Sequence, residues 1–106
     1  MGTTMGEFER AVLLAVSRLG EAAYGMTVRR ELETRLKRAV SIGAVYTTLD
    51  RMEEKGFVSS SVGEPTAERG GRAKKYFRVE APGVDALNRS KEVSDAVWAL
   101  MPARTK

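Results

Sequence analysis

The first part of the chain carries two apolar stripes with a repeat of three to four residues, the spacing of one helix face. The first stripe predicts a helix over 7–19 that ends at Gly20, with Leu13 and Leu14 widening its apolar side. The second predicts a helix over roughly 25–38. The stripe positions are Phe8, Val12, Val16 and Leu19 in the first segment, and Val28, Leu32 and Leu36 in the second.

A third helix is predicted between Ser41, a residue suited to capping its start, and Gly56, a residue suited to ending it. Its apolar stripe consists of Ile42, Val45, Leu49 and Met52. The positions outside that stripe, which we expect to be exposed, are Ala44, Tyr46, Thr47, Thr48 and Arg51. The hydroxyl groups among them are suited to bonding with phosphates and with the edges of nucleic-acid bases.

A β-hairpin is predicted after the third helix. The segments 57–62 and 74–79 have the composition of strands, and Phe77 and Val79 fall on one face of the second segment. The connecting stretch 63–72 is longer than a tight turn and rich in Gly, Pro and charged residues. We therefore expect it to project from the molecule as a loop, in the manner of a wing.

The last predicted helix begins at Pro82 and runs to about residue 101. Its apolar residues occupy two neighbouring arcs, one with Val84, Leu87, Trp98 and Met101 and the other with Ala86, Val93, Val97 and Leu100. An apolar surface this wide needs more than one surface to cover it. The candidate residues of an interface with a second subunit are Val84, Leu87, Val93, Val97, Trp98, Leu100 and Met101.

Length and composition limit the function classes. A chain of 106 residues suits one hydrophobic core. It contains no Cys and no His, which excludes thiolate nucleophiles, zinc sites built from these residues, and histidine bases. It also lacks a phosphate-binding P-loop and a dinucleotide-binding glycine motif. We expect no enzymatic activity, no metal and no cofactor. Without a long apolar run or a secretory signal, we expect a cytoplasmic protein.

The positive charge is concentrated in one segment. Five basic residues and no acidic ones lie between positions 69 and 78, namely Arg69, Arg72, Lys74, Lys75 and Arg78. The whole chain carries a net charge of only +4, so the other residues together carry −1. These side chains are suited to neutralising phosphates, and Gly70 and Gly71 allow the loop backbone to approach a groove closely.

The order of three helices, a hairpin and a final helix predicts a mainly α fold with a small β-hairpin. With a basic loop, this is the layout of a winged helix-turn-helix whose third helix enters the major groove of DNA. We assign residues 1–81 to that domain and 82–106 to a dimerisation helix and tail. The candidate contacts with double-stranded DNA are Ser41, Tyr46, Thr47, Thr48, Arg51, Arg69, Gly70, Gly71, Arg72, Lys74 and Lys75.

Several of these candidate DNA contacts also have an interpretation that involves no ligand. The basic hairpin could be a solvated surface, and Tyr46 could pack its ring against the edge of the domain. Thr47 and Thr48 could be ordinary solvated residues, and Arg51 could pair with Glu53 or Glu54 of its own helix. At the level of the whole protein, the alternative is a winged-helix module that binds proteins and not DNA.

Residues 6 to 84 resemble the PadR family of bacterial transcriptional regulators. The motifs that carry the resemblance are Tyr24 with Gly25; the run Gly43, Tyr46, Leu49, Arg51, Glu53 and Gly56; and the segment 70–78 with sequence GGRAKKYFR. The resemblance implies a homodimer, usually a repressor, bound to a pseudo-palindromic operator. The positions that match the family's DNA surface are Ser41, Tyr46, Thr47, Arg69, Gly70, Arg72 and Lys74.

The chain resembles the short subgroup of the family, which has a single C-terminal helix. That implies dimerisation through residues 84–101, with help from the first helix. Members of the family respond to aromatic or drug-like small molecules, so Trp98 has two interpretations: an anchor of the dimer interface or a contact for an aromatic effector. We favour the anchor, because aromatic residues are enriched in the cores of interfaces.

Overall fold

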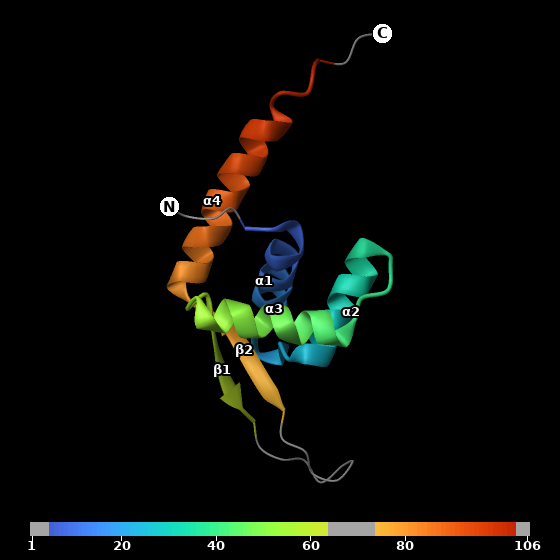
Figure 1. Cartoon of the computed structure of the whole chain (residues 1–106), viewed down its shortest axis with the longest axis vertical. Helices are drawn as coiled ribbons and strands as arrows, with labels where there is room; N and C mark the ends of the chain where they lie inside the picture. Colours follow the sequence, from blue (N-terminus) through green and yellow to red (C-terminus); the bar gives the residue numbers. More distant parts are fainter. Residues whose placement is uncertain (1–4, 64–73, 104–106) are drawn as a thin grey trace.

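The computed structural model describes residues 5–63 and 74–103, and it has the predicted mainly α fold with one β-hairpin. The elements are α1 (Glu7–Leu19), a short 3-10 turn (Gly20–Ala22), α2 (Gly25–Leu36), α3 (Ile42–Glu54), β1 (Val58–Val62), β2 (Lys75–Val79) and α4 (Ala81–Trp98). Figure 1 shows α1, α2 and α3 gathered above the hairpin, while α4 runs away from this body toward the C-terminus.

The core lies where the three stripes predicted from the sequence meet. The largest fully buried side chains are Val12, Leu13 and Val16 of α1, Val28 of α2, and Val45, Leu49 and Met52 of α3. Phe77 of β2 closes the core from the side of the hairpin. Each such side chain stabilises the fold by about 1.5–3 kcal/mol through burial. Leu14 does not belong to this core: it is 51% exposed, because it lies about 200° around the helix from both Val12 and Val16.

The ends of the helices follow the chemistry of their terminal residues. Ser41 caps α3 as predicted, since its Oγ accepts a hydrogen bond of 3.2 Å from the Ala44 N–H. Gly56 follows α3 with φ +79°. The predicted end of α2 at residue 38 is wrong, because Lys37 adopts the left-handed conformation with φ 56° and stops the helix at Leu36.

The last helix is also shorter than predicted. It ends at Trp98, and the N–H groups of Leu100 and Met101 then bond to carbonyls only three residues back, at 3.0 Å each. Such i→i+3 bonds tighten the last turn of many helices. In the described residues, no helix has both the length and the apolar character to cross a membrane.

The hairpin is antiparallel and is tied to the helices through β2. Its register pairs Val58 with Val79 and Ser60 with Phe77, and the Gly63 N–H continues the ladder with a 2.8 Å bond to the Lys74 carbonyl. On its other edge, β2 bonds to the segment that leads into α2: the Phe77 N–H donates a hydrogen bond of 2.9 Å to the Ala23 carbonyl. The base of the hairpin is thereby fixed next to the start of α2.

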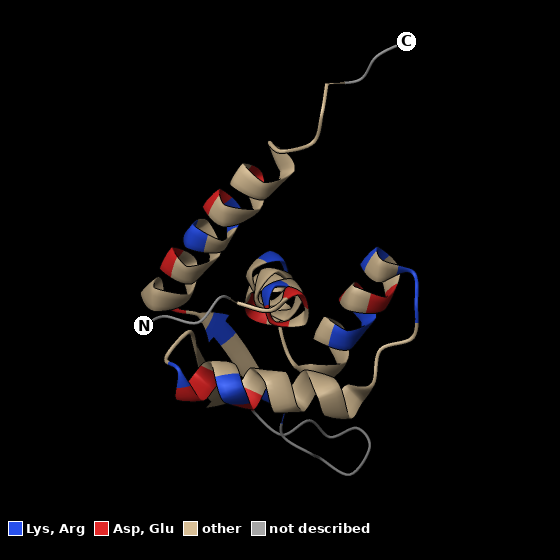
Figure 2. Cartoon of the chain, turned by 45° about the horizontal axis from the view of Figure 1, so that its top comes forward, with Lys and Arg blue, Asp and Glu red and all other residues tan. Residues whose placement is uncertain are grey.

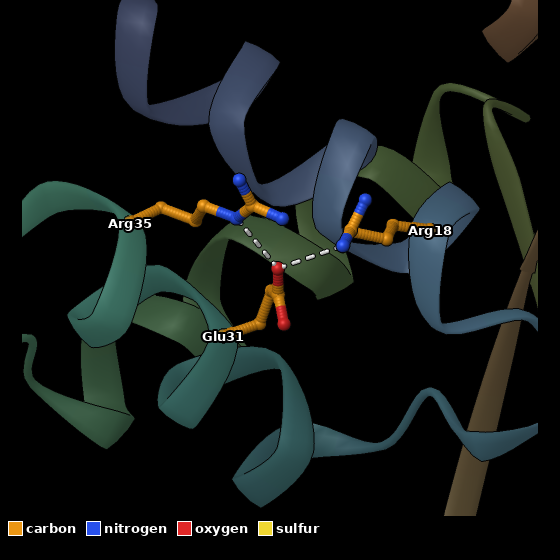
Figure 3. A network of polar contacts seen from close by, with 3 residues as sticks. All are labelled: Arg18, Glu31 and Arg35. Carbon is orange, nitrogen blue, oxygen red and sulfur yellow. Dashed lines mark hydrogen bonds and ion pairs between the residues drawn. The ribbon is translucent and has the colours of Figure 1, made fainter.

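An ion-pair network joins α1 to α2 (Figure 3). The Glu31 Oε2 atom lies 3.1 Å from the Nε of Arg18 on α1 and 3.0 Å from the Nε of Arg35 on α2. Both arginines are mostly exposed, so each pair contributes only about 0–1 kcal/mol. The network helps to set the position of α2 against α1, while most of the stabilisation comes from the apolar core.

Candidate nucleic-acid interface

The N-terminal half of α3 presents an uncharged surface to solvent. All charged residues of α3 lie in its second half, from Asp50 onward, and Figure 2 shows the half that follows Ser41 without blue or red. Tyr46 and Thr47 are exposed there, as predicted, because Val45 and Leu49 face the core. This half of α3 can therefore approach base edges without bringing a carboxylate near the phosphates.

Thr48 does not belong to that surface, and the expectation that it is exposed is wrong. Its exposed fraction is 5%. Thr48 lies three residues after Val45 and four before Met52, so the helical repeat places it on the buried face together with them. A buried threonine at this position cannot reach a base without unfolding part of the domain.

Tyr46 is held against the start of α2. A Cβ atom added to Gly25, the first residue of α2, would stand 2.3 Å from both the Cζ and the Oη of Tyr46. No side chain fits there, so the glycine allows the tyrosine ring to lie on the backbone of α2. Tyr46 nonetheless remains 42% exposed. Tyr46 thus packs at the edge of the domain, as the alternative interpretation predicted, and part of its side chain is still exposed to solvent.

An aromatic contact supports the base of the wing. Tyr24, just before α2, and Tyr76 of β2 form a backbone bridge, and their rings meet edge to face with centroids 5.4 Å apart. The Lys74 Nζ lies 5.0 Å from the centre of the Tyr24 ring, within range of a cation–π interaction. Gly63 leaves room for Tyr76, because a Cβ on Gly63 would lie 2.7 Å from its Cε1. Sequence reasoning did not identify Tyr76, although its position in β2 places it on the opposite face from Phe77.

Glu53 links α3 to both strands. Its Oε2 accepts a 2.6 Å hydrogen bond from the Ser60 hydroxyl of β1, and its Oε1 lies 3.5 Å from the Lys75 Nζ of β2. The Ser60 hydrogen bond, with a further contribution from the charge of Lys75, holds the pKa of the Glu53 carboxyl below its usual value. Lys75, one of the predicted DNA contacts, is therefore oriented by α3 in the free protein.

Arg51 forms an ion pair with α1, and not with the residues of its own helix that the alternative interpretation named. Its Nη1 lies 3.5 Å from the Oε2 of Glu9 in α1, and the Lys55 Nζ lies 3.6 Å from the same oxygen. The alternative partners considered from the sequence were Glu53 and Glu54. The Arg51 side chain is about half exposed, so the pair does not remove it from solvent.

Four predicted DNA contacts, Arg69, Gly70, Gly71 and Arg72, lie outside the described residues. Lys74 and Lys75 mark the point where the hairpin re-enters the described part of the chain, and both are exposed. The structure thus brings together Tyr46, Lys74 and Lys75 around the start of α2 and the base of the hairpin.

Most of the candidate dimer surface is exposed in the last turns of α4 and in the residues directly after it. Val84, Val93, Val97, Trp98, Leu100 and Met101 are all exposed large apolar residues, and the last three are 66%, 80% and 63% accessible. Leu87 differs from them, because it is partly buried against the core of its own domain. The first part of α4 thus packs on the domain except at Val84, and the part after Ser90 carries uncovered apolar side chains.

Three packed helices followed by a hairpin, with an accessible third helix beside basic strand residues, define a winged-helix DNA-binding protein. The pattern of the "Transcriptional regulator PadR-like family" matches residues 12–89. The chain therefore belongs to this family, and it is a DNA-binding transcriptional regulator. Members of the family are in general not enzymes. No curated protein matches the chain.

Solved structures agree with this assignment. A PadR-like transcriptional regulator from Bacillus cereus is 25% identical, with a TM-score of 0.67, over 92% of this chain and 93% of that one. RosR from H. salinarum is 26% identical, with a TM-score of 0.65, over 92% of this chain and 80% of that one. A PadR-like transcription factor from Bacteroides fragilis shares the fold at 21% identity, with a TM-score of 0.69 over 92% of each chain.

Proposed function

We propose that the protein is a homodimeric repressor that binds an inverted-repeat operator, with one α3 helix in the major groove of each half-site. The observation that carries this proposal is the uncharged, exposed N-terminal half of α3 beside the lysines at the base of the hairpin. Tyr46 and Thr47 are then the side chains that meet base edges or phosphates. Ser41, at the N-terminus of α3, lies where the helix dipole favours a phosphate group.

The wing supplies the electrostatic part of binding. Lys74, Lys75, Arg69 and Arg72 neutralise backbone phosphates, and Gly70 and Gly71 let the loop approach a groove. Because these contacts are with the backbone, they add affinity for every DNA sequence. Sequence preference comes from α3. In this proposal residues 1–81 form the DNA-binding domain, and residues 82–106 join the DNA-binding domains of two chains.

A second copy of the chain is the partner that fits the uncovered part of α4. Val93, Val97 and Trp98 leave a large apolar area in water, which a monomer rarely exposes. An inverted repeat presents two identical sites related by a two-fold axis, and a two-fold symmetric dimer matches that symmetry. Leu14 is a further exposed apolar residue, on α1.

Trp98 acts in this proposal as an anchor of the dimer interface. An aromatic effector that stacks on the paired indoles and releases DNA is the further possibility that the sequence raised. A compound that quenches the emission of Trp98, the only tryptophan of the chain, and also lowers operator affinity would identify such an effector.

The test is selection of bound sequences from a random duplex library, followed by affinity measurements at two salt concentrations. We expect an inverted repeat with half-sites about one helical turn apart, and affinity that falls steeply with salt. Repression is then tested with a reporter placed behind the selected operator. If no sequence is enriched and binding is weak at both salt concentrations, the winged helix binds a protein and the proposal is wrong.

A further inference from the structure

The first turn of α4 is seated on the turn between α3 and β1. The Glu80 N–H donates to the Phe57 carbonyl at 2.9 Å. A Cβ added to Gly83 would stand 2.3 Å from that same carbonyl oxygen, so the helix approaches more closely than any other residue allows. The Glu80 carboxylate also accepts a short hydrogen bond from the Ser59 hydroxyl. The root of α4 is thus fixed to the DNA-binding body by backbone and side-chain contacts.

A second contact holds α4 two turns further along. The Arg10 guanidinium of α1 donates a 2.9 Å hydrogen bond from Nη1 to the Ser90 Oγ, across 80 positions of sequence. Ser90 is 8% exposed, and no described residue of α4 beyond it is buried. Ser90 is therefore the last buried residue of α4, and its bond to Arg10 ties the helix to α1 just before the apolar segment begins.

Because the contact lies where α4 leaves the domain, a small change of angle there moves the far end of the helix. From Ser90 to its last residue, Trp98, α4 extends about 12 Å at the rise of an α-helix. A tilt of roughly 16° at Ser90 displaces the far end by about 3.4 Å, the rise of one base pair. The angle of α4 against the body consequently decides how far apart a dimer formed through α4 holds its two α3 helices.

We propose that Arg10 and Ser90 are positioning residues that set the half-site separation accepted by the dimer. The close contact of Gly83 with the Phe57 carbonyl holds the start of α4 in place. The inference rests on the proposed homodimer. It assigns the spacing of the half-sites to a contact between α1 and α4 of one chain, because the geometry of a symmetric dimer fixes the spacing that it can bind.

The experiment compares the unmodified chain with Ser90→Ala, Arg10→Met and the double variant. Each is titrated with inverted repeats whose spacer varies by single base pairs, and with a duplex that holds one half-site. We expect the preference for the best spacer over its neighbours to fall roughly fivefold in each single variant, in line with the loss of one hydrogen bond. The double variant loses no more, because both changes remove the same bond. Affinity for the single half-site stays unchanged.

Glu92→Gln is the matched control. It changes an exposed side chain two positions beyond Ser90, on the polar side of α4 that also carries Asn88 and Asp95. This variant keeps the spacer preference of the unmodified chain. The inference is overturned if Ser90→Ala and Arg10→Met also keep it, or if they weaken all duplexes equally, the half-site included. Failure of the dimer proposal is seen separately, as a monomeric unmodified chain that selects no repeat.

Discussion

Tyr46 of α3 lies directly on the backbone of Gly25, with its Oη 2.3 Å from the place where a Cβ would stand. Two elements that meet DNA in winged-helix proteins, the start of α2 and the exposed side of α3, are joined by this contact. The glycine determines how deeply the tyrosine ring is seated. It therefore also determines where the phenol oxygen points.

Replacing Gly25 with Ala should displace Tyr46. We expect the free energy of unfolding to fall by about 1–3 kcal/mol, as in other overpacked sites, and operator affinity to fall with it. Thermal or denaturant unfolding and a binding titration measure the two effects. Gly43→Ala is the control for stability, because a Cβ there meets only the Ser41 Oγ at an ordinary 3.5 Å. Unchanged stability and affinity in Gly25→Ala would show that Tyr46 is not seated on Gly25.

Thr47 and Thr48 should behave differently although they are neighbours. Thr47→Ala removes an exposed hydroxyl, so we expect a change in the preferred operator sequence with little loss of stability. Thr48→Ala leaves a small void in the core and should lower the free energy of unfolding by about 1 kcal/mol without changing sequence preference. Repeating the library selection and the unfolding measurement with both variants separates the two roles. Reversed results would place Thr48 on the DNA surface.

Glu53 should make stability depend on pH. Its pKa is lowered in the folded state by the Ser60 hydroxyl and Lys75. As pH falls, the Glu53 carboxyl therefore takes up its proton first in the unfolded chain. Its contribution to the free energy of unfolding is complete above the ordinary pKa of 4.5 and is lost as pH falls below that value. Glu53→Gln should flatten this part of the curve of unfolding free energy against pH. Glu54→Gln, at an exposed carboxylate of the same turn, serves as the control, and equal flattening in both variants would count against the Glu53 linkage.

Arg69 and Arg72 should contribute to affinity without sequence preference. Replacing both with Ala should weaken binding to specific and random DNA alike. It should also lower the slope of log affinity against log salt by about 0.9 for each lost phosphate contact. Arg89→Ala, at an exposed position of α4, controls for the loss of one positive charge, half of the change in the double variant. A double variant with an unchanged slope would exclude these residues from the phosphate contacts.

Trp98→Ala should weaken the dimer. A buried tryptophan at an interface often accounts for 2 kcal/mol or more of binding, so we expect the dimer dissociation constant to rise about thirtyfold. Sedimentation equilibrium measures this constant, and Glu92→Gln, on the polar side of the same helix, is the control. The emission of Trp98 should also shift to shorter wavelength as the dimer forms. An unchanged dissociation constant in Trp98→Ala would place the interface elsewhere.

The sequence was sufficient to predict the elements and the face that each of α1 and α3 buries, because apolar spacing directly reflects helical geometry. It misplaced Thr48, since a threonine beside Val45 and Leu49 counts as polar in the pattern although its methyl group packs well. Leu14 was wrongly predicted to widen the buried side of α1, because an apolar residue beside an apolar stripe was assigned to the core.

Contacts between distant segments could not be predicted in this way. The pairing of Arg51 with Glu9, the seat of Tyr46 on Gly25 and the bond from Arg10 to Ser90 all depend on how helices cross in the folded chain. No periodicity within one segment encodes such crossings. The candidate site could therefore be located on α3 and the hairpin from the sequence, while the orientation of its side chains required the structure.

The most direct test of the account is the mass of the complex formed on a selected operator, measured by sedimentation or native mass spectrometry. We predict two chains on a duplex with both half-sites, and weaker binding to that duplex when Tyr46 or Thr47 is replaced. A single chain on that duplex at saturation, or binding that is indifferent to Tyr46 and Thr47, would contradict the proposal that a symmetric dimer binds its operator through α3.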